Sequence, residues 1–142
     1  MDQHEGGFEF FAVTADTGIR AWGPDLPAVF RQAARALWSL LVEPTSVERR
    51  QTVGVSVEAG DRDALLVAWL NELLYLYETQ GLVGAGCTIR SMTDTGLSAE
   101  VWGEAVDRAR HTIVSHVKAV TYHQLHVRRT ASGWEAQVVV DV

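Results

Sequence analysis

Cysteine is almost absent from this 142-residue sequence, which contains only Cys87. One thiol excludes an intramolecular disulfide and a zinc site made of several cysteines, and it is typical of a reducing compartment. Long apolar runs are absent too, since no stretch reaches the about 18 apolar residues of a membrane helix. The start MDQHEGG lacks the basic and apolar regions of a signal peptide. We therefore expect a cytoplasmic protein that does not contact a membrane.

Basic residues are outnumbered, with 12 Lys and Arg against 18 Asp and Glu and a net charge of −6. Binding to nucleic acid requires a basic surface, so this balance argues against a chain that wraps RNA by itself. We expect RNA to be reached only indirectly, through a partner. Familiar catalytic motifs are also missing, because there is no Gly-x-Ser-x-Gly elbow, glycine-rich phosphate loop or His-Glu-x-x-His pair. The sequence by itself does not indicate an enzyme.

The chain does contain enough apolar sequence for one folded domain. Hydrophobic residues make up 47% and charged residues 21% of the chain, which is ordinary for a globular protein. A chain of this length can bury a real core. We expect residues 1–7 to be a flexible segment and residues 8–142 to form the domain.

Apolar periodicity predicts the element order ββαβαββββ. The first helix starts after the N-cap Asp25, and the second is capped by Asp61 or Asp63 and closed by Gly81. Apolar residues cover more than half the circumference of the second helix, which predicts that it is sandwiched. The turn DTG at 94–96 joins two strands, and the last four strands look like consecutive hairpins. The fold class is therefore α+β, a single domain with a largely antiparallel sheet packed with two helices.

The segment VKAVTYHQLHV at 117–127 alternates like a β-strand, yet its inward side carries Thr121 and His123. Buried polar side chains require hydrogen-bond partners, so we expect these two to bond to each other or to strand ends. The alternative for His123 is a purely structural role, in which it stabilises the sheet. Lys118 and Tyr122 lie on the wet side, where they are expected to contact a partner. The alternative for Tyr122 is an ordinary sheet aromatic.

Two aspartates are candidates for a metal site. Asp16 follows the first strand in TADTG, and Asp141 precedes Val142, which brings a backbone carbonyl and the carboxylate of the chain end. If the first and last strands are neighbours, these oxygens converge into a hard-ligand site that suits calcium, magnesium or manganese. The alternatives are an Asx turn at Asp16 and a solvated carboxylate at Asp141.

Other titratable residues are weaker candidates. The histidines at 111, 116, 123 and 126 raise a transition-metal alternative, but His116 and His126 lie too far apart on one strand to bind one ion. Scattered surface histidines and a buried, hydrogen-bonded one fit this spacing better. Glu72 falls inside the apolar band of the second helix, where it is either a functional carboxylate or a residue at the edge of the stripe.

Five segments occur in order along almost the whole chain: FEFFAVTADTGIRAWG, LLVAWLNELLYLYETQGLV, AEVWGE, VKAVTYHQLHV and WEAQVVVDV. Together they resemble the archease family. The resemblance implies a small α+β protein that acts as a non-enzymatic accessory factor of RtcB-type RNA ligases. These ligases use GTP and manganese to join a 2′,3′-cyclic phosphate or 3′-phosphate end to a 5′-hydroxyl end, in tRNA splicing and RNA repair. The accessory factor speeds guanylylation of the ligase and restores multiple turnover.

The same resemblance implies a metal site, usually with calcium, at Asp16, Asp141 and the backbone carbonyl of Val142. Lys118 falls on a lysine that the family needs to stimulate the ligase. Tyr122 and His123, in the same segment, are expected to belong to the contact surface.

One position departs from the family pattern. The motif His-Thr-Ala-Asp-x-Gly has Val13 in place of its histidine here. A histidine at this position can orient Asp16 or bind the ion, so its loss bears on the identity or the affinity of the metal. Two alternatives to the ligase cofactor stay open. One is a metal-binding, chaperone-like interaction module without a ligase partner, and the other is a hydrolase in which Asp16 and Asp141 hold an ion that activates water.

Overall fold

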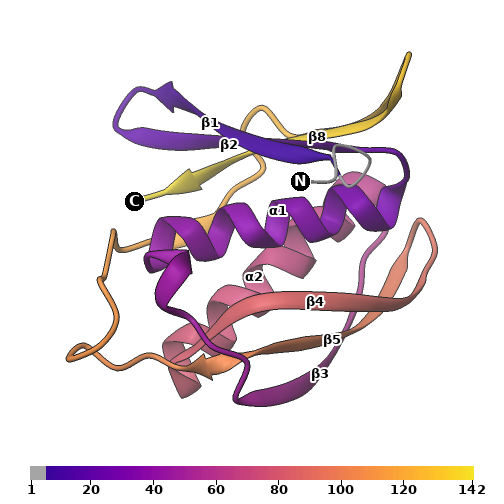
Figure 1. Cartoon of the computed structure of the whole chain (residues 1–142). Helices are drawn as coiled ribbons and strands as arrows, with labels where there is room; N and C mark the ends of the chain where they lie inside the picture. The colour runs from indigo at the N-terminus through magenta and orange to yellow at the C-terminus, as the bar shows by residue number, and fades with distance from the viewer. Residues whose placement is uncertain (1–5) are drawn as a thin grey trace.

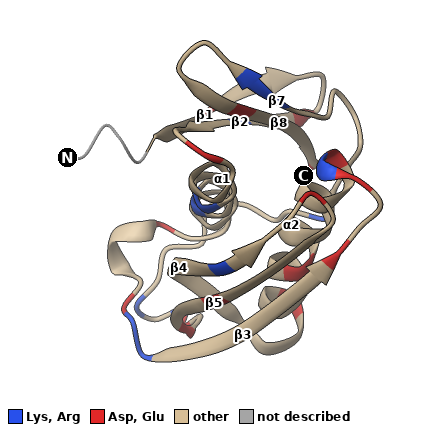
Figure 2. Ribbon diagram, turned by 90° about the vertical axis from the view of Figure 1, so that its right-hand side faces the viewer, with Lys and Arg blue, Asp and Glu red and all other residues tan. Residues whose placement is uncertain are grey.

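Two helices lie between two antiparallel β-sheets, so the molecule has three layers (Figure 1 and Figure 2). The computed structural model describes residues 6–142. The expected α+β class, with two helices and antiparallel strands, is confirmed, and the strands divide between two sheets. The segment expected to be flexible, residues 1–7, falls largely outside the described residues, and Gly7 begins the first strand.

The first sheet has the order β1-β2-β8-β6, and β7 also pairs with β8. Its strands are β1 (Gly7–Val13), β2 (Asp16–Gly23), β6 (Ala119–Val120), β7 (His126–Thr130) and β8 (Gly133–Asp141). Because β2 occupies one side of β8, the short strands β6 and β7 share its other side. They form one edge strand in two pieces.

The second sheet has the order β3-β5-β4. It consists of β3 (Gln51–Glu58), β4 (Leu82–Met92) and β5 (Gly96–Ala105), and the expected hairpin around residues 94–96 joins the last two. The expectation that the last four strands form consecutive hairpins is wrong, because β5 and β6 lie in different sheets. The connection at 106–118 carries the chain from one sheet to the other.

The helices α1 (Leu26–Leu41) and α2 (Arg62–Gln80) begin where the sequence predicts, and α2 also ends there at Gly81. A short 3₁₀ helix, η2 (Pro44–Ser46), follows α1. Asp25 caps α1, and Asp61 rather than Asp63 caps α2 by accepting a backbone N–H at 2.8 Å. Gly81 ends α2 at φ 69°, a left-handed conformation that glycine adopts without steric cost. No helix among residues 6–142 is long and apolar enough to cross a membrane.

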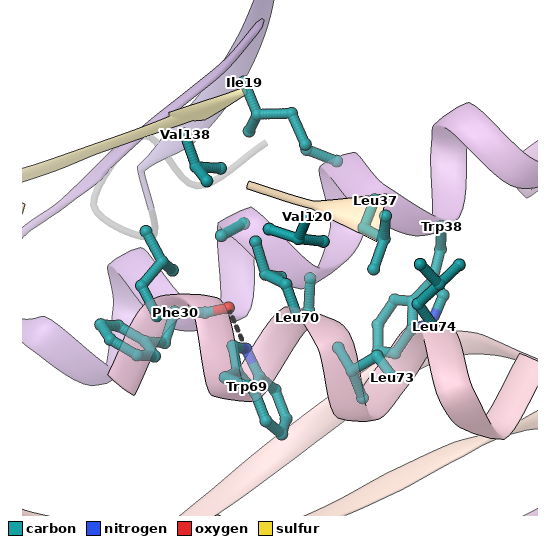
Figure 3. Packing of buried hydrophobic residues seen from close by; sticks show 14 of the residues in the cluster. Ile19, Phe30, Leu37, Trp38, Trp69, Leu70, Leu73, Leu74, Val120 and Val138 are labelled. Carbon is teal, nitrogen blue, oxygen red and sulfur yellow. Dashed lines mark hydrogen bonds between the residues drawn. The ribbon is translucent and has the colours of Figure 1, made fainter. Parts of the chain in front are cut away.

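The core joins all three layers. Helix α2 contacts strands of both sheets, as its broad apolar surface predicts. The indole Nε1 of Trp69, a fully buried side chain, donates to the carbonyl of Phe30 at 3.0 Å and links the two helices (Figure 3). Ile19 and Val138 reach the same cluster from the first sheet, and Cys87 is buried as a small apolar residue.

The predicted continuous strand at 117–127 is wrong. Strand β6 ends at Val120, and β7 begins only at His126. Between them the chain leaves the sheet in a turn, where Gln124 has φ 52°. Two side chains of α2 form hydrogen bonds with the backbone of the two short strands. The amide of Asn71 bonds both backbone groups of Val120, at 3.2 and 3.5 Å, and Asp63 accepts the N–H of residue 127 at 2.9 Å.

This break changes which side chains are buried. His123 is exposed, so its expected burial is wrong, and its Nε2 lies 3.3 Å from Nε2 of Gln124. Val120, which alternation places on the same side as Lys118 and Tyr122, is 5% exposed. Thr121 is half-buried, and its hydroxyl donates to the carbonyl of Val139 at 2.8 Å. The threonine therefore finds the partner that a partly buried hydroxyl requires, whereas the histidine needs none.

Candidate functional site

The expected metal ligands lie at one end of the first sheet. The pairing of β2 with β8 reaches Thr17 and Val140, so Asp16 and Asp141 are the next residues on adjacent strands. The strand beside β8 is β2 and not β1, and Asp16 is its first residue. On the other side of β8, the backbone N–H of Lys118 donates to the carbonyl of Asp141 at 2.7 Å. The fold thus carries three distant parts of the chain to the same sheet end.

Both carboxylates project from the face of the sheet that is turned away from the helices. Ile19 and Val140 are buried in the core, and side chains alternate along a strand, so positions 16 and 141 point the other way. Asp16 and Asp141 are half-buried. Neither carboxylate has a hydrogen bond or an ion pair with any residue in the described part of the chain. Their oxygens are free to bind a cation.

The turn between β1 and β2 fixes the position of Asp16. Thr14 and Ala15 form a two-residue turn, and Val13 pairs directly with Asp16. Ala15 has φ 65°, a left-handed conformation that costs a residue with a side chain about 1 kcal/mol. Val13 is therefore the cross-strand neighbour of Asp16 on the same face. The valine occupies the place from which a histidine would reach this carboxylate.

The donor set at this sheet end consists of hard oxygen atoms. Two carboxylates are present, and Val142, which is 37% exposed, follows with a backbone carbonyl. Calcium, magnesium and manganese prefer such ligands. Within residues 6–142, no three or more His, Cys, Asp or Glu side chains gather in a group that could hold a metal ion. The residues fit an ion whose remaining ligands are carbonyls and water, and they do not fit a histidine-based transition-metal site.

The residues expected at a partner surface are exposed. Lys118 and Tyr122 lie on the surface as predicted, and Tyr122 is 66% exposed. His123 joins them on the turn between β6 and β7 rather than in the core. Lys118, Tyr122 and His123 thus form an exposed segment next to Asp141.

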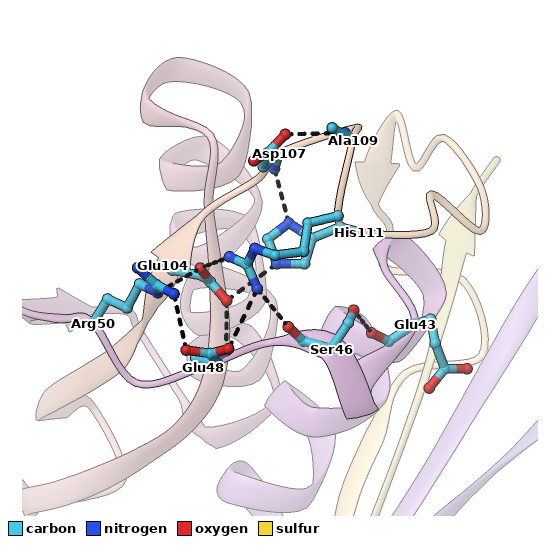
Figure 4. A network of polar contacts seen from close by, with 9 residues as sticks. Glu43, Ser46, Glu48, Arg50, Glu104, Asp107, Ala109 and His111 are labelled. Carbon is cyan, nitrogen blue, oxygen red and sulfur yellow. Dashed lines mark hydrogen bonds and ion pairs between the residues drawn. The ribbon is translucent and has the colours of Figure 1, made fainter.

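A second polar cluster lies where β5 ends, and the sequence did not indicate it (Figure 4). Glu104 is 3% exposed, and its carboxylate accepts the N–H of Glu48 at 2.6 Å and Nε2–H of His111 at 3.1 Å. It also forms ion pairs with Arg110 and Arg50. Strand alternation hides this residue, because period 2 places position 104 on the outward face with Glu100 and Trp102.

The charge of Glu104 is maintained by its donors. Burial raises the pKa of this carboxyl. Hydrogen bonds from Glu48, Arg110 and His111 lower the pKa by more than burial raises it, so the resulting pKa is about 2. The Nδ1 atom of His111 accepts the backbone N–H of Asp107 at 2.8 Å, so its proton sits on Nε2 and points at Glu104. The cluster fastens the start of the 106–118 connection, which leads to Lys118.

Comparison with known proteins agrees with this architecture. A model of the Archease protein family matches residues 8–142. The chain belongs to the archease family. Protein archease of Pyrococcus furiosus is 34% identical over 139 residues, which cover 95% of this chain and 98% of that protein. Protein archease of Thermococcus gammatolerans is 37% identical with the same coverage. The solution structure of Methanobacterium thermoautotrophicum protein 1598 superposes with a TM-score of 0.79 at 32% identity, covering 96% of this chain and 99% of that one.

These matches confirm the resemblance that the five sequence segments indicated. They extend over 98% of each of the two archease proteins. The segment WLNELLYL contains Asn71, which joins α2 to the first sheet. Its asparagine holds strand β6, which carries the chain from Lys118 into the sheet.

Proposed function

We propose that this protein is a non-enzymatic accessory factor of an RtcB-type RNA ligase in the cytoplasm. It promotes guanylylation of the ligase and multiple-turnover joining of RNA ends in tRNA splicing and RNA repair, and RNA is bound by the ligase. Membership of the archease family supports this proposal. The observation that carries it is the meeting of Asp16, Asp141 and Lys118 at one sheet end.

The proposal includes a divalent metal ion, with calcium as the first choice and magnesium or manganese as alternatives. The ligands are the carboxylates of Asp16 and Asp141 and the backbone carbonyl of Val142. When bound, the ion neutralises two carboxylates at adjacent strand ends, whose charges otherwise repel each other. Asp16 is held by the β1–β2 turn and Asp141 by its pairing with β6, so little ordering is required.

The contact surface for the ligase consists of Lys118, Tyr122 and His123. An exposed tyrosine supplies a large contact area at low entropic cost, and such residues often anchor interfaces. Lys118 supplies a compact positive charge on the segment whose backbone N–H bonds the carbonyl of Asp141. The turn that presents Tyr122 and His123 is fixed at both ends by α2, so the surface is ordered before the partner arrives.

The first test is RNA ligation by a cognate RtcB-type ligase at limiting enzyme. We expect product to exceed one equivalent of ligase only when this protein is added. No gain in product would refute the ligase role and favour an interaction module without a ligase partner. In the same assay, Asp16→Asn and Lys118→Ala should each abolish the gain. The matched control is Glu58→Gln, which removes an exposed charge from the other sheet and should leave the gain unchanged. Glu58 has no ion pair with any residue among 6–142.

The metal is tested without the ligase. We expect calcium to raise the melting temperature of the protein, because an ion that binds only the folded state stabilises that state. At a free calcium concentration of one hundred times Kd, the free energy of unfolding should rise by about 2.7 kcal/mol. Asp16→Asn should remove this rise. Val13→His should strengthen it, because position 13 pairs directly with Asp16. A calcium response that is the same in the wild type and Asp16→Asn would remove this carboxylate from the site.

A further inference from the structure

A groove with unpaired positive charge lies between the end of α2 and the 106–118 connection. Its volume is about 540 Å³, within the usual range for small-molecule sites. The helix contributes Tyr77, Glu78 and Gly81, and the connection contributes Val106, Arg108, His116 and Lys118. The groove is therefore lined by three basic side chains and one carboxylate, although the net charge of the chain is −6.

The two cations of this groove are exceptional in the molecule. The sequence has 12 lysines and arginines, all within the described residues. Every one except Arg108 and Lys118 has an ion pair, a hydrogen bond, a ring contact or another electrostatic interaction through its side chain in the structure. His116 is likewise the one histidine among residues 6–142 whose ring has no partner. Within residues 6–142, all the unpartnered basic side chains therefore line the same groove.

The backbone that carries these side chains is ordered. Arg108 sits in a turn whose conformation is set by Asp107, since the Asp107 carboxylate accepts the N–H of Ala109 at 3.0 Å and its carbonyl accepts the N–H of His111 at 2.6 Å. The buried carboxylate of Glu104 holds His111 in turn. The backbone of residue 106 also donates to the carbonyl of Gly81 at 2.7 Å, which closes the groove against the helix.

The other wall is formed by residues 116–118. Val117 is 1% exposed and packs in the core, whereas the side chains on either side of it line the groove. His116 and Lys118 are both exposed. The N–H of Lys118 is bonded to Asp141, so this residue ends the groove beside the expected metal ligands.

We propose that this groove binds phosphate groups, either of a free nucleotide or of an RNA end. Arg108 supplies a planar fork of N–H donors, and Lys118 supplies a mobile point charge, which is the combination that recognises phosphate oxygens. His116 offers a further ring N–H donor. Tyr77 lines the groove as its aromatic residue, and an aromatic side chain of this kind provides a stacking surface for a base. The site stands on these residues alone, and only the choice of phosphate source rests on the proposed ligase function.

The test measures binding to the protein alone by calorimetry and by amide chemical shifts. The probes are pyrophosphate, GTP and a short RNA with a 3′-phosphate, each in the presence of a chelator so that no metal ion carries the phosphate. We expect pyrophosphate to bind and to shift the amides of Gly81, Val106 and Arg108. Tighter binding of GTP than of the RNA identifies a nucleotide as the source, and the reverse identifies an RNA end.

Variants decide whether the groove is responsible. Arg108→Gln and Lys118→Gln should each weaken pyrophosphate binding about tenfold, which is the usual effect of one hydrogen bond to a charged group. Glu78→Gln should strengthen it about threefold, because the carboxylate in the lining repels phosphate. The control is Arg90→Gln, which removes one exposed positive charge from the other sheet and should change nothing.

Absence of binding by all three probes, or binding that survives either groove substitution, would overturn the proposal. Both groove side chains are exposed and lack partners among residues 6–142, so these variants should fold, which circular dichroism can verify. Loss of ligase stimulation has no bearing on this outcome, because the binding assay contains no ligase. The two proposals can therefore fail separately.

Discussion

Replacement of Glu104 by glutamine tests the buried cluster at the end of β5. The substitution keeps the size of the side chain and one oxygen acceptor but removes the charge that faces Arg50 and Arg110. Breaking a buried ion pair costs roughly 3–5 kcal/mol, because a partner charge is left without compensation. The side chains of Arg50 and Arg110 are 60% and 36% exposed, so water can solvate them. We therefore expect the free energy of unfolding to fall by about 3 kcal/mol at neutral pH, the lower end of that range.

The pH dependence makes this expectation specific. The pKa of Glu104 is about 2 in the folded protein, against its ordinary value of 4.5. As the pH falls below 4.5, the unfolded chain takes up a proton that the folded chain still excludes, so the native state loses stability. The contribution of Glu104 is fully present above pH 4.5 and disappears toward pH 2. The gap between wild type and Glu104→Gln should therefore be widest at pH 7 and clearly narrower at pH 3.

Urea unfolding followed by tryptophan fluorescence at both pH values measures this gap. The matched control is Glu100→Gln on the same strand, whose carboxylate pairs with the exposed Arg90. Surface pairs contribute about 0–1 kcal/mol, so this variant should change stability little at either pH. A gap for Glu104→Gln that is equal at pH 7 and pH 3, or no larger than that of the control, would refute the reasoning.

Three further substitutions test the helix contacts and the helix end. Asn71→Ala should cost about 1–3 kcal/mol by leaving the backbone of Val120 unpaired, and amide exchange at Val120 should become faster, which hydrogen-exchange NMR measures. Trp69→Phe should cost about 2 kcal/mol through the lost hydrogen bond between the helices and the smaller ring, measured by urea unfolding. Gly81→Ala should cost about 1 kcal/mol in the same assay, because φ is 69° there. Gly54→Ala is its control, since an added Cβ at position 54 meets no atom within 4 Å.

Local signals made the helices predictable from the sequence. Asp25 and Gly81 act on backbone groups within a few residues of themselves, so the ends of α1 and α2 follow from short stretches of sequence. The broad apolar surface of α2 likewise predicted its place between two layers. The division of the strands between two sheets could not be predicted in this way. This division depends on the sheet to which the connection at 106–118 leads, and no local pattern in that segment specifies the destination.

The strand break at 121–125 was missed for a related reason. Alternation of side chains continues through these residues, but the pairing is decided by Asn71 and Asp63, which lie on α2 far back in the sequence.

The candidate site could be predicted only in part from the sequence. The sequence identified Asp16, Asp141 and Lys118 as separate candidates, and only the register between β2 and β8 shows that two of them are adjacent. Arg108 gave no signal at all, since its significance comes from the partners that it lacks.

The divided edge strand also affects self-association. The free backbone groups of an edge strand are a template on which another copy of the chain can add a strand, and natural sheets protect such edges. Here Asn71 occupies the N–H and the carbonyl of Val120, and Asp63 occupies the N–H of Val127. The turn between β6 and β7 interrupts the row of backbone groups between these points. These two side chains of α2 therefore leave no continuous row of free backbone groups on this edge with which another copy of the chain could pair.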